Sequence, residues 1–224
     1  MYIPTHEPDT DNAGVGNMKI FVHMIGEVQK GFPDFLRSGN MTNTKKLTTC
    51  AMMVALSTVL AFISKVIPAP WLQGGSITIA SMVPIILVSI LIDTKWGLLS
   101  GFVYSLIQML SGFYPPPTQT FINFALVVLL DYVFAFTVLG FAGAFYRMMG
   151  KKLWAIPVSG VIVTALRYVC HIFSGILIWG VYADEGQTVL AYAVGYNGGY
   201  MIPEIIITGI VLAALAPKLQ KLCA

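Results

Sequence analysis

Long apolar stretches separated by short polar segments are the main pattern of the chain beyond residue 45. A helix needs about 20 apolar residues to cross a hydrocarbon core about 30 Å thick, and in lipid it satisfies its own backbone hydrogen bonds. The pattern therefore predicts an all-α integral membrane protein with six transmembrane helices. The expected spans are residues 48–67, 76–92, 96–113, 120–146, 154–181 and 195–216.

The composition supports the membrane assignment. Of the 224 residues, 57% are hydrophobic and only 10% are charged, whereas a soluble domain carries roughly 25% charged residues. This deficit argues against a nucleic-acid-binding protein, a secreted disulfide scaffold and a cytosolic enzyme. The three cysteines, Cys50, Cys170 and Cys223, have no spacing typical of a metal site, so we expect no metal.

Basic residues in the short loops predict the orientation, because cytoplasmic loops are enriched in lysine and arginine. One side of the expected bundle has only Lys65, together with the acidic pair Asp184 and Glu185. The N- and C-termini are therefore expected in the cytoplasm. The opposite side has eight basic residues: Lys45, Lys46, Lys95, Arg147, Lys151, Lys152, Lys218 and Lys221.

Residues 1–44 differ from the rest of the chain and are predicted to be an N-terminal extension of a six-helix membrane domain, residues 45–224. The extension begins polar and then places apolar residues, from Ile20 to Phe32, at helical spacing. It is either a helix lying in the membrane interface or a disordered leader.

Ionisable residues within membrane spans are costly, at least about 2.5–3.5 kcal/mol each for a charged group, so they indicate a function. The expected spans contain Asp131, Arg167, His171 and Glu204. At 1.5 Å per residue, Asp131 and His171 lie at similar depths, about 15–16 Å from the outer side. Arg167 and His171 share one helix face because they are four residues apart. Mutual neutralisation of Asp131 and Arg167 is the structural alternative to a binding role.

Aromatic and amide side chains accompany these groups in the outer half of the expected bundle. A carboxylate offsets the charge of a cation, aromatic faces stack on it, and an amide both donates and accepts hydrogen bonds. The pattern favours a pocket for a small, flat, cationic molecule. The accompanying residues are Tyr132, Trp179, Tyr192, Tyr196 and Asn197. Glu204 is expected either in a hydrated mouth or in a pair across helices.

Two further segments carry weaker signals. Gln73–Ser76, with two adjacent glycines, is either a mobile lid or a plain turn. Ala51 and Ala55 place small residues one turn apart, which lets another helix approach closely. The sequence contains no catalytic signature and no phosphate-binding loop, so we expect no catalytic residues and no cofactor. Uphill transport would need energy from a partner or an ion gradient.

Several of these motifs, in this order, resemble the thiamine-specific S-components of bacterial energy-coupling factor (ECF) transporters, the ThiT or YuaJ-like family. The resemblance covers about residues 45–217. The matching segments are residues 129–136, 139–143 and 167–171, Ser174-Gly175, Trp179, Tyr192, Tyr196-Asn197 and Gln73–Ser76.

The resemblance implies a subunit of the bacterial plasma membrane that binds thiamine near the outer face. It then docks on a transmembrane coupling subunit with two ATPases and releases the vitamin inside. The resemblance places Ala51 and Ala55 at the contact with the coupling subunit. It implies binding roles for Asp131, Tyr132, Arg167, His171, Trp179, Tyr192 and Asn197.

Three alternatives remain open from the sequence. The ligand could be the hydroxymethylpyrimidine precursor of thiamine or another vitamin. A small membrane enzyme could use His171 and Asp131 as acid and base on a lipid. A proton-coupled carrier could use Asp131, Arg167 and His171 as a relay.

Overall fold

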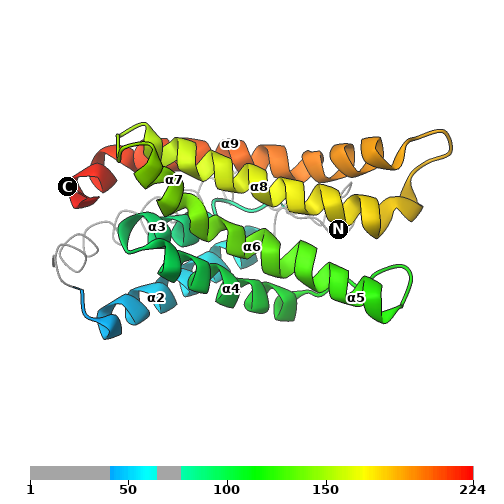
Figure 1. Cartoon of the computed structure of the whole chain (residues 1–224), viewed down its shortest axis with the longest axis horizontal. Coiled ribbons are helices and arrows are strands. Elements are labelled where there is room, and N and C mark those ends of the chain that lie inside the picture. The colour runs from blue at the N-terminus through cyan, green and yellow to red at the C-terminus, as the bar shows by residue number, and fades with distance from the viewer. Residues whose placement is uncertain (1–40, 65–76, 224) are drawn as a thin grey trace, which may run out of the picture. The chain divides into compact units, whose positions relative to one another are not determined.

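The computed structural model describes residues 41–64 and 77–223, and every regular element within these residues is helical (Figure 1). Helical runs occupy all six predicted spans. The first three are α2 (Asn43–Ser64), α3 (Val83–Leu91) and α4 (Thr94–Ser111). The fourth is continuous from α5 (Phe121–Val127) through η1 (Val128–Phe134), α6 (Ala135–Thr137) and η2 (Val138–Phe141) to α7 (Ala142–Met148). The last two are α8 (Ala155–Leu177), followed by the short η3 (Trp179–Tyr182), and α9 (Val189–Cys223).

Four of these helices are long and apolar enough to cross a membrane by themselves. They are Asn43–Ser64, Phe121–Met148, Ala155–Leu177 and Val189–Leu222. The prediction of an all-α membrane protein is confirmed. The second span differs in extent from its prediction, because only Val83–Leu91 of residues 76–92 is helical.

The helix α3 lies in the middle of the bundle. Every residue from Val83 to Ile90 is buried, and α3 contacts α2, α4, α7, α8 and α9. A helix that is apolar on all sides is typically surrounded by protein. Glycines permit this close packing: a Cβ on Gly143 would collide with the backbone of Ser89, whose hydroxyl accepts the Gly143 N–H at 2.8 Å.

The segment before α3, residues 77–82, is not helical because side chains from other helices capture its backbone. Glu204 on α9 accepts the Thr78 N–H, and Ser64 Oγ on α2 accepts the Ile79 N–H at 2.7 Å. Ala80 adopts a φ of 59°, which breaks helical geometry. Irregular backbone at membrane depth is tolerated where protein buries it, and this segment is largely buried.

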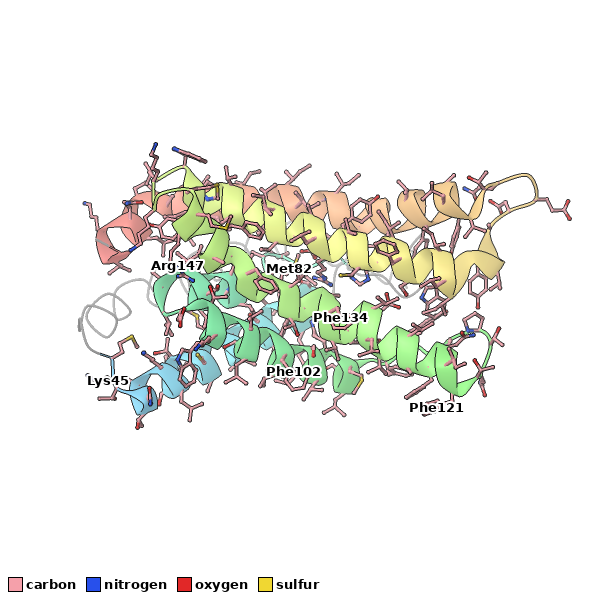
Figure 2. The ribbon with its side chains drawn as sticks, in the orientation of Figure 1. Lys45, Met82, Phe102, Phe121, Phe134 and Arg147 are labelled. Carbon is pink, nitrogen blue, oxygen red and sulfur yellow. The ribbon has the colours of Figure 1, made fainter. Side chains whose placement is uncertain are left out.

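The helices α8 and α9 lie side by side along the bundle, as Figure 1 shows. The basic residues Lys45 and Arg147 lie at one end of the bundle, and Phe121 lies at the other (Figure 2). The expected N-terminal extension falls almost wholly outside the described residues, and Gln73–Ser76 does so entirely, so their roles remain predictions.

Candidate functional site

Asp131 lies in η1, a π-helical stretch within the fourth span. A π-helix has a wider turn than an α-helix and frequently marks functional sites. The Asp131 side chain is 18% exposed, and it faces α8 and η3.

Three neutral donors surround the Asp131 carboxylate. His171 Nδ1 lies 3.1 Å from Oδ1, while Ser174 Oγ and Trp179 Nε1 donate to Oδ2 at 2.6 and 3.1 Å. His171 and Ser174 are three residues apart on α8, so they share a face. These contacts stabilise a negative charge without cancelling it.

The hydrogen bonds of His171 define its tautomer. Arg167 Nε donates to His171 Nε2 at 3.3 Å, so Nε2 accepts. A carboxylate can only accept, so Nδ1 carries the proton that is donated to Asp131. In this arrangement the imidazole is neutral, and it connects Arg167 to Asp131.

Arg167 forms no ion pair with Asp131. Its Nη1 donates to Met82 Sδ at 2.9 Å, and its guanidinium carbon lies 4.1 Å from the centre of the Phe136 ring. Figure 2 shows Met82 near the middle of the bundle. Direct neutralisation of Asp131 by Arg167, the structural alternative, is therefore not what the geometry shows.

Asn197 connects α9 to α8 beside the Asp131 cluster, which is Asp131 with its donors His171, Ser174 and Trp179. Its Nδ2 donates to the carbonyl oxygens of His171 (3.2 Å) and Ala193 (2.8 Å), and its Oδ1 accepts the Tyr200 hydroxyl at 2.5 Å. The amide donors are thus occupied, while Oδ1 keeps one lone pair for a further donor.

Aromatic rings extend from the cluster along two paths. Trp179 lies 5.4 Å from Tyr114 and 6.3 Å from Tyr182 between ring centres. On α9, Tyr200 contacts the His171 ring at 5.8 Å, and Tyr196 links Tyr200 to Tyr192. Tyr192 therefore joins the cluster through two other rings rather than by direct contact.

Tyr132, next to Asp131 in sequence, points elsewhere. Its hydroxyl donates to the Gly112 carbonyl at 3.0 Å and accepts the Tyr114 N–H at 3.1 Å, and its ring stacks on Phe113. The structure does not bring Tyr132 into the Asp131 cluster. Instead, Tyr132 holds the loop that carries Tyr114, whose ring contacts Trp179.

Glu204 does not lie in a hydrated mouth, and within residues 41–64 and 77–223 it forms no ion pair. Its side chain is 1% exposed, and Oε1 accepts both the N–H and the hydroxyl of Thr78, the latter at 2.5 Å. It bonds Thr78 of the non-helical segment before α3, through both the backbone and the side chain, which neither of the two expectations described.

Sequence reasoning missed several residues of the cluster. Ser174 follows His171 by three residues, and Tyr200 follows Asn197 by three, so helical periodicity was the available signal. Met82 and Phe136 contact Arg167 from other elements, and no local pattern indicates them.

The predicted docking residues, Ala51 and Ala55, are both exposed on α2. The neighbouring Met52, Val59 and Phe62 are exposed as well. No cluster of three or more potential metal ligands occurs in residues 41–64 and 77–223.

Comparison with known proteins agrees with the fold and with the resemblance in sequence. The chain is 34% identical over 194 residues to the thiamine transporter ThiT of Bacillus subtilis (strain 168), covering 80% of this chain and 97% of that protein. It is 30% identical over 103 residues to the thiamine transporter ThiT of Lacticaseibacillus paracasei, covering 41% of this chain and 51% of that one.

A solved structure of ThiT from Listeria monocytogenes has the same fold. The TM-score is 0.61 at 24% sequence identity, over 78% of this chain and 96% of that one. Residues 47–224 match the family described as thiamine transporter protein (Thia_YuaJ). With most of its length matched, the chain belongs to this family of membrane transporters.

Proposed function

We propose that this chain binds thiamine beside Asp131 and is the substrate-binding subunit of a thiamine uptake transporter. One observation carries the proposal: a partly exposed carboxylate within the bundle has three neutral donors and, among the described residues, no lysine or arginine paired with it. Such a group retains its negative charge for a ligand. Family membership and the thiamine transporters that the chain resembles support thiamine as that ligand.

The chemistry of thiamine suits the surroundings of Asp131. Its thiazolium ring is permanently cationic, and its aminopyrimidine ring is flat. A carboxylate and aromatic faces are the groups that attract such a cation in a medium of low dielectric. Trp179 and the α9 tyrosines Tyr192, Tyr196 and Tyr200 supply the aromatic faces. The free lone pair of Asn197 Oδ1 can accept a hydrogen bond from the amino group of the aminopyrimidine.

Within this proposal the predicted residues take different roles. Asp131 faces the thiazolium, and Trp179 and Tyr192 contribute ring surfaces. His171 orients Asp131, and Arg167 orients His171. Tyr132 acts indirectly, by holding the loop that bears Tyr114 against Trp179.

Binding titrations with the purified, detergent-solubilised chain test the proposal. Asp131→Asn keeps the size of the side chain but removes its charge, so we expect thiamine affinity to fall by roughly 30-fold or more, since losing one partner of a buried charge pair costs about 2 kcal/mol or more. Asp184→Asn, the same change in an exposed loop, is the matched control and should bind normally. Unchanged affinity in Asp131→Asn would refute the proposal.

The same titrations separate the nearest alternative ligand. Hydroxymethylpyrimidine lacks the thiazolium, so it should bind much more weakly than thiamine. Equal affinity for both would identify a precursor-binding protein instead. A proton relay through Asp131, His171 and Arg167 is disfavoured, because arginine is not deprotonated in proteins and its next hydrogen-bond partner, the Met82 thioether, has no proton to pass on.

We also infer that transport requires a partner, namely a transmembrane coupling subunit with two ATPases. The resemblance to S-components supports this assignment. So does the exposure of Ala51 and Ala55, because small residues let a partner helix approach the backbone of α2 closely.

A further inference from the structure

Three charged side chains lie inside the bundle, away from the helix ends, in the part of the chain that the structure describes. They are Asp131, Arg167 and Glu204. The hydrogen bonds of His171 make it neutral, as shown above. Arg167 carries a positive charge and Asp131 a negative one in the arrangement above, so the net charge of the interior depends on the ionisation of Glu204.

The position of Glu204 is defined by neutral donors. Both hydrogen bonds reach Oε1, from the N–H and the hydroxyl of Thr78, and these stabilise a negative charge. Oε2 is buried and has no hydrogen-bond partner in the described residues. The charged group within electrostatic range of this carboxylate is Arg167.

Arg167 therefore interacts electrostatically with Glu204 and is linked to Asp131 through His171, and among the described residues it forms no direct hydrogen bond or ion pair with either carboxylate. It reaches Asp131 through the neutral His171. It also contacts Met82, four residues after Thr78 in the segment that Glu204 holds. Glu204 follows Asn197 by seven residues, about 10 Å along α9, so it is a neighbour of the site and not part of its lining.

We propose that Glu204 carries a negative charge and offsets the charge of Arg167, which leaves the charge of Asp131 uncompensated and makes the site selective for a cationic ligand over a neutral one of the same shape. Without Glu204, Arg167 and Asp131 would sum to zero. With Glu204, the three interior side chains sum to one negative charge, which a bound thiazolium neutralises. The inference rests on the proposed function and assigns Glu204 as a specificity-determining residue.

The experiment compares two ligands on the full chain. Thiamine and 3-deazathiamine, in which carbon replaces the charged ring nitrogen, have nearly the same shape and differ in charge. Glu204→Gln retains an acceptor oxygen for Thr78 and removes the charge. We expect its thiamine affinity to fall on the order of tenfold, with little change for 3-deazathiamine, taking the rise of about 10 Å between Glu204 and Asn197 as the charge separation and an effective dielectric of about 20.

Two further variants complete the test. Thr208→Val, one turn later on α9, replaces a buried hydroxyl that has no partner in the described residues, so both affinities should stay unchanged. Arg167→Gln removes the opposing charge, so the ratio of thiamine to 3-deazathiamine affinity should rise. Arg167→Gln tests the charge balance even where Glu204→Gln yields no folded protein.

The outcomes separate this inference from the proposed function. A wild-type chain that does not bind thiamine overturns both. A wild-type chain that prefers thiamine, with the same preference in Glu204→Gln or in Arg167→Gln, overturns only the charge balance. Equal losses for both ligands in Glu204→Gln also overturn it, because they indicate a purely structural role.

Discussion

A carboxylate inside a membrane protein can be stabilised by a cation or by neutral donors, and the difference determines what it can bind. A paired cation would leave little charge for a ligand. The donors on Asp131 are a neutral imidazole, a hydroxyl and an indole N–H. They lower the cost of keeping the charge in the bundle and still leave it available, which suits a ligand that brings its own positive charge.

Ser174→Ala tests this arrangement at a residue that sequence reasoning missed. Ser174 Oγ donates to Asp131 at 2.6 Å and lies 3.1 Å from Trp179 Nε1, so its loss removes one donor and loosens the indole. We expect thiamine to bind about fivefold more weakly, which corresponds to about 1 kcal/mol for one hydrogen bond. Titration of thiamine measures the effect.

The control for this change lies on the same helix. Ser159 is also fully buried, but its hydroxyl donates to the Ile156 carbonyl, and it precedes His171 by twelve residues and Ser174 by fifteen. Ser159→Ala should therefore leave thiamine affinity as it is. If the two variants lost affinity equally, the effect would belong to the packing of α8 and not to Asp131.

The proximity of Asp131 and His171 was predictable, because polar groups are rare enough in apolar spans for their depths to be compared, whereas Asn197 was expected only in the same outer half. The direction of Tyr132 was not predictable. Sequence adjacency suggested that it joins Asp131, but neighbouring residues on a helix face different sides, and Tyr132 bonds the loop at Gly112 and Tyr114. Its role depends on a loop conformation that no local pattern indicates.

At the level of elements, η1 determines where Asp131 points. The downstream part of the same span is fixed, because Gly140 packs against the backbone of α4 at Leu98 and Gly143 packs against Ser89. The wide turns of Val128–Phe134 then rotate the upstream part relative to this anchor. Asp131 reaches α8 because of that rotation.

Deletion of Val133 tests the contribution of η1. Removing one residue allows the wide turn to close into an α-helix, which changes the angle and the depth at which Asp131 meets its donors on α8 while the glycines stay anchored. We expect thiamine binding to be lost while helix content, measured by circular dichroism, is retained. Deletion of Gly186, exposed in the loop before α9, removes a residue without turning Asp131 and should preserve binding. Binding that survives the deletion of Val133 would show that η1 is dispensable.

The positions of the helices followed from the sequence better than their internal form. Hydrophobic length alone located all six runs, since spanning lipid imposes it. The short α3 was not predictable, because the groups that interrupt its span, Ser64 and Glu204, come from α2 and α9. The π-helix was also missed, because tertiary packing and not local composition produces it.

On the scale of the whole molecule, the proposed ligand site and the proposed docking face belong to different helices of the described bundle. The polar cluster joins η1, α8 and α9. The exposed face of α2, with Ala51, Ala55 and Met52, belongs to a different helix. Substitutions on one face can therefore change transport and leave binding intact.

Ala51→Trp makes this separation measurable. A bulky indole on the exposed face of α2 prevents another helix from approaching closely, while it touches no group of the Asp131 cluster. We expect normal thiamine affinity in titrations and loss of thiamine uptake by cells that express the coupling subunit and ATPases. Ile206→Trp, an equally exposed apolar site on α9, is the matched control and should transport normally. Full uptake by Ala51→Trp would remove α2 as the docking surface, whereas weakened binding would mean that the two faces are coupled.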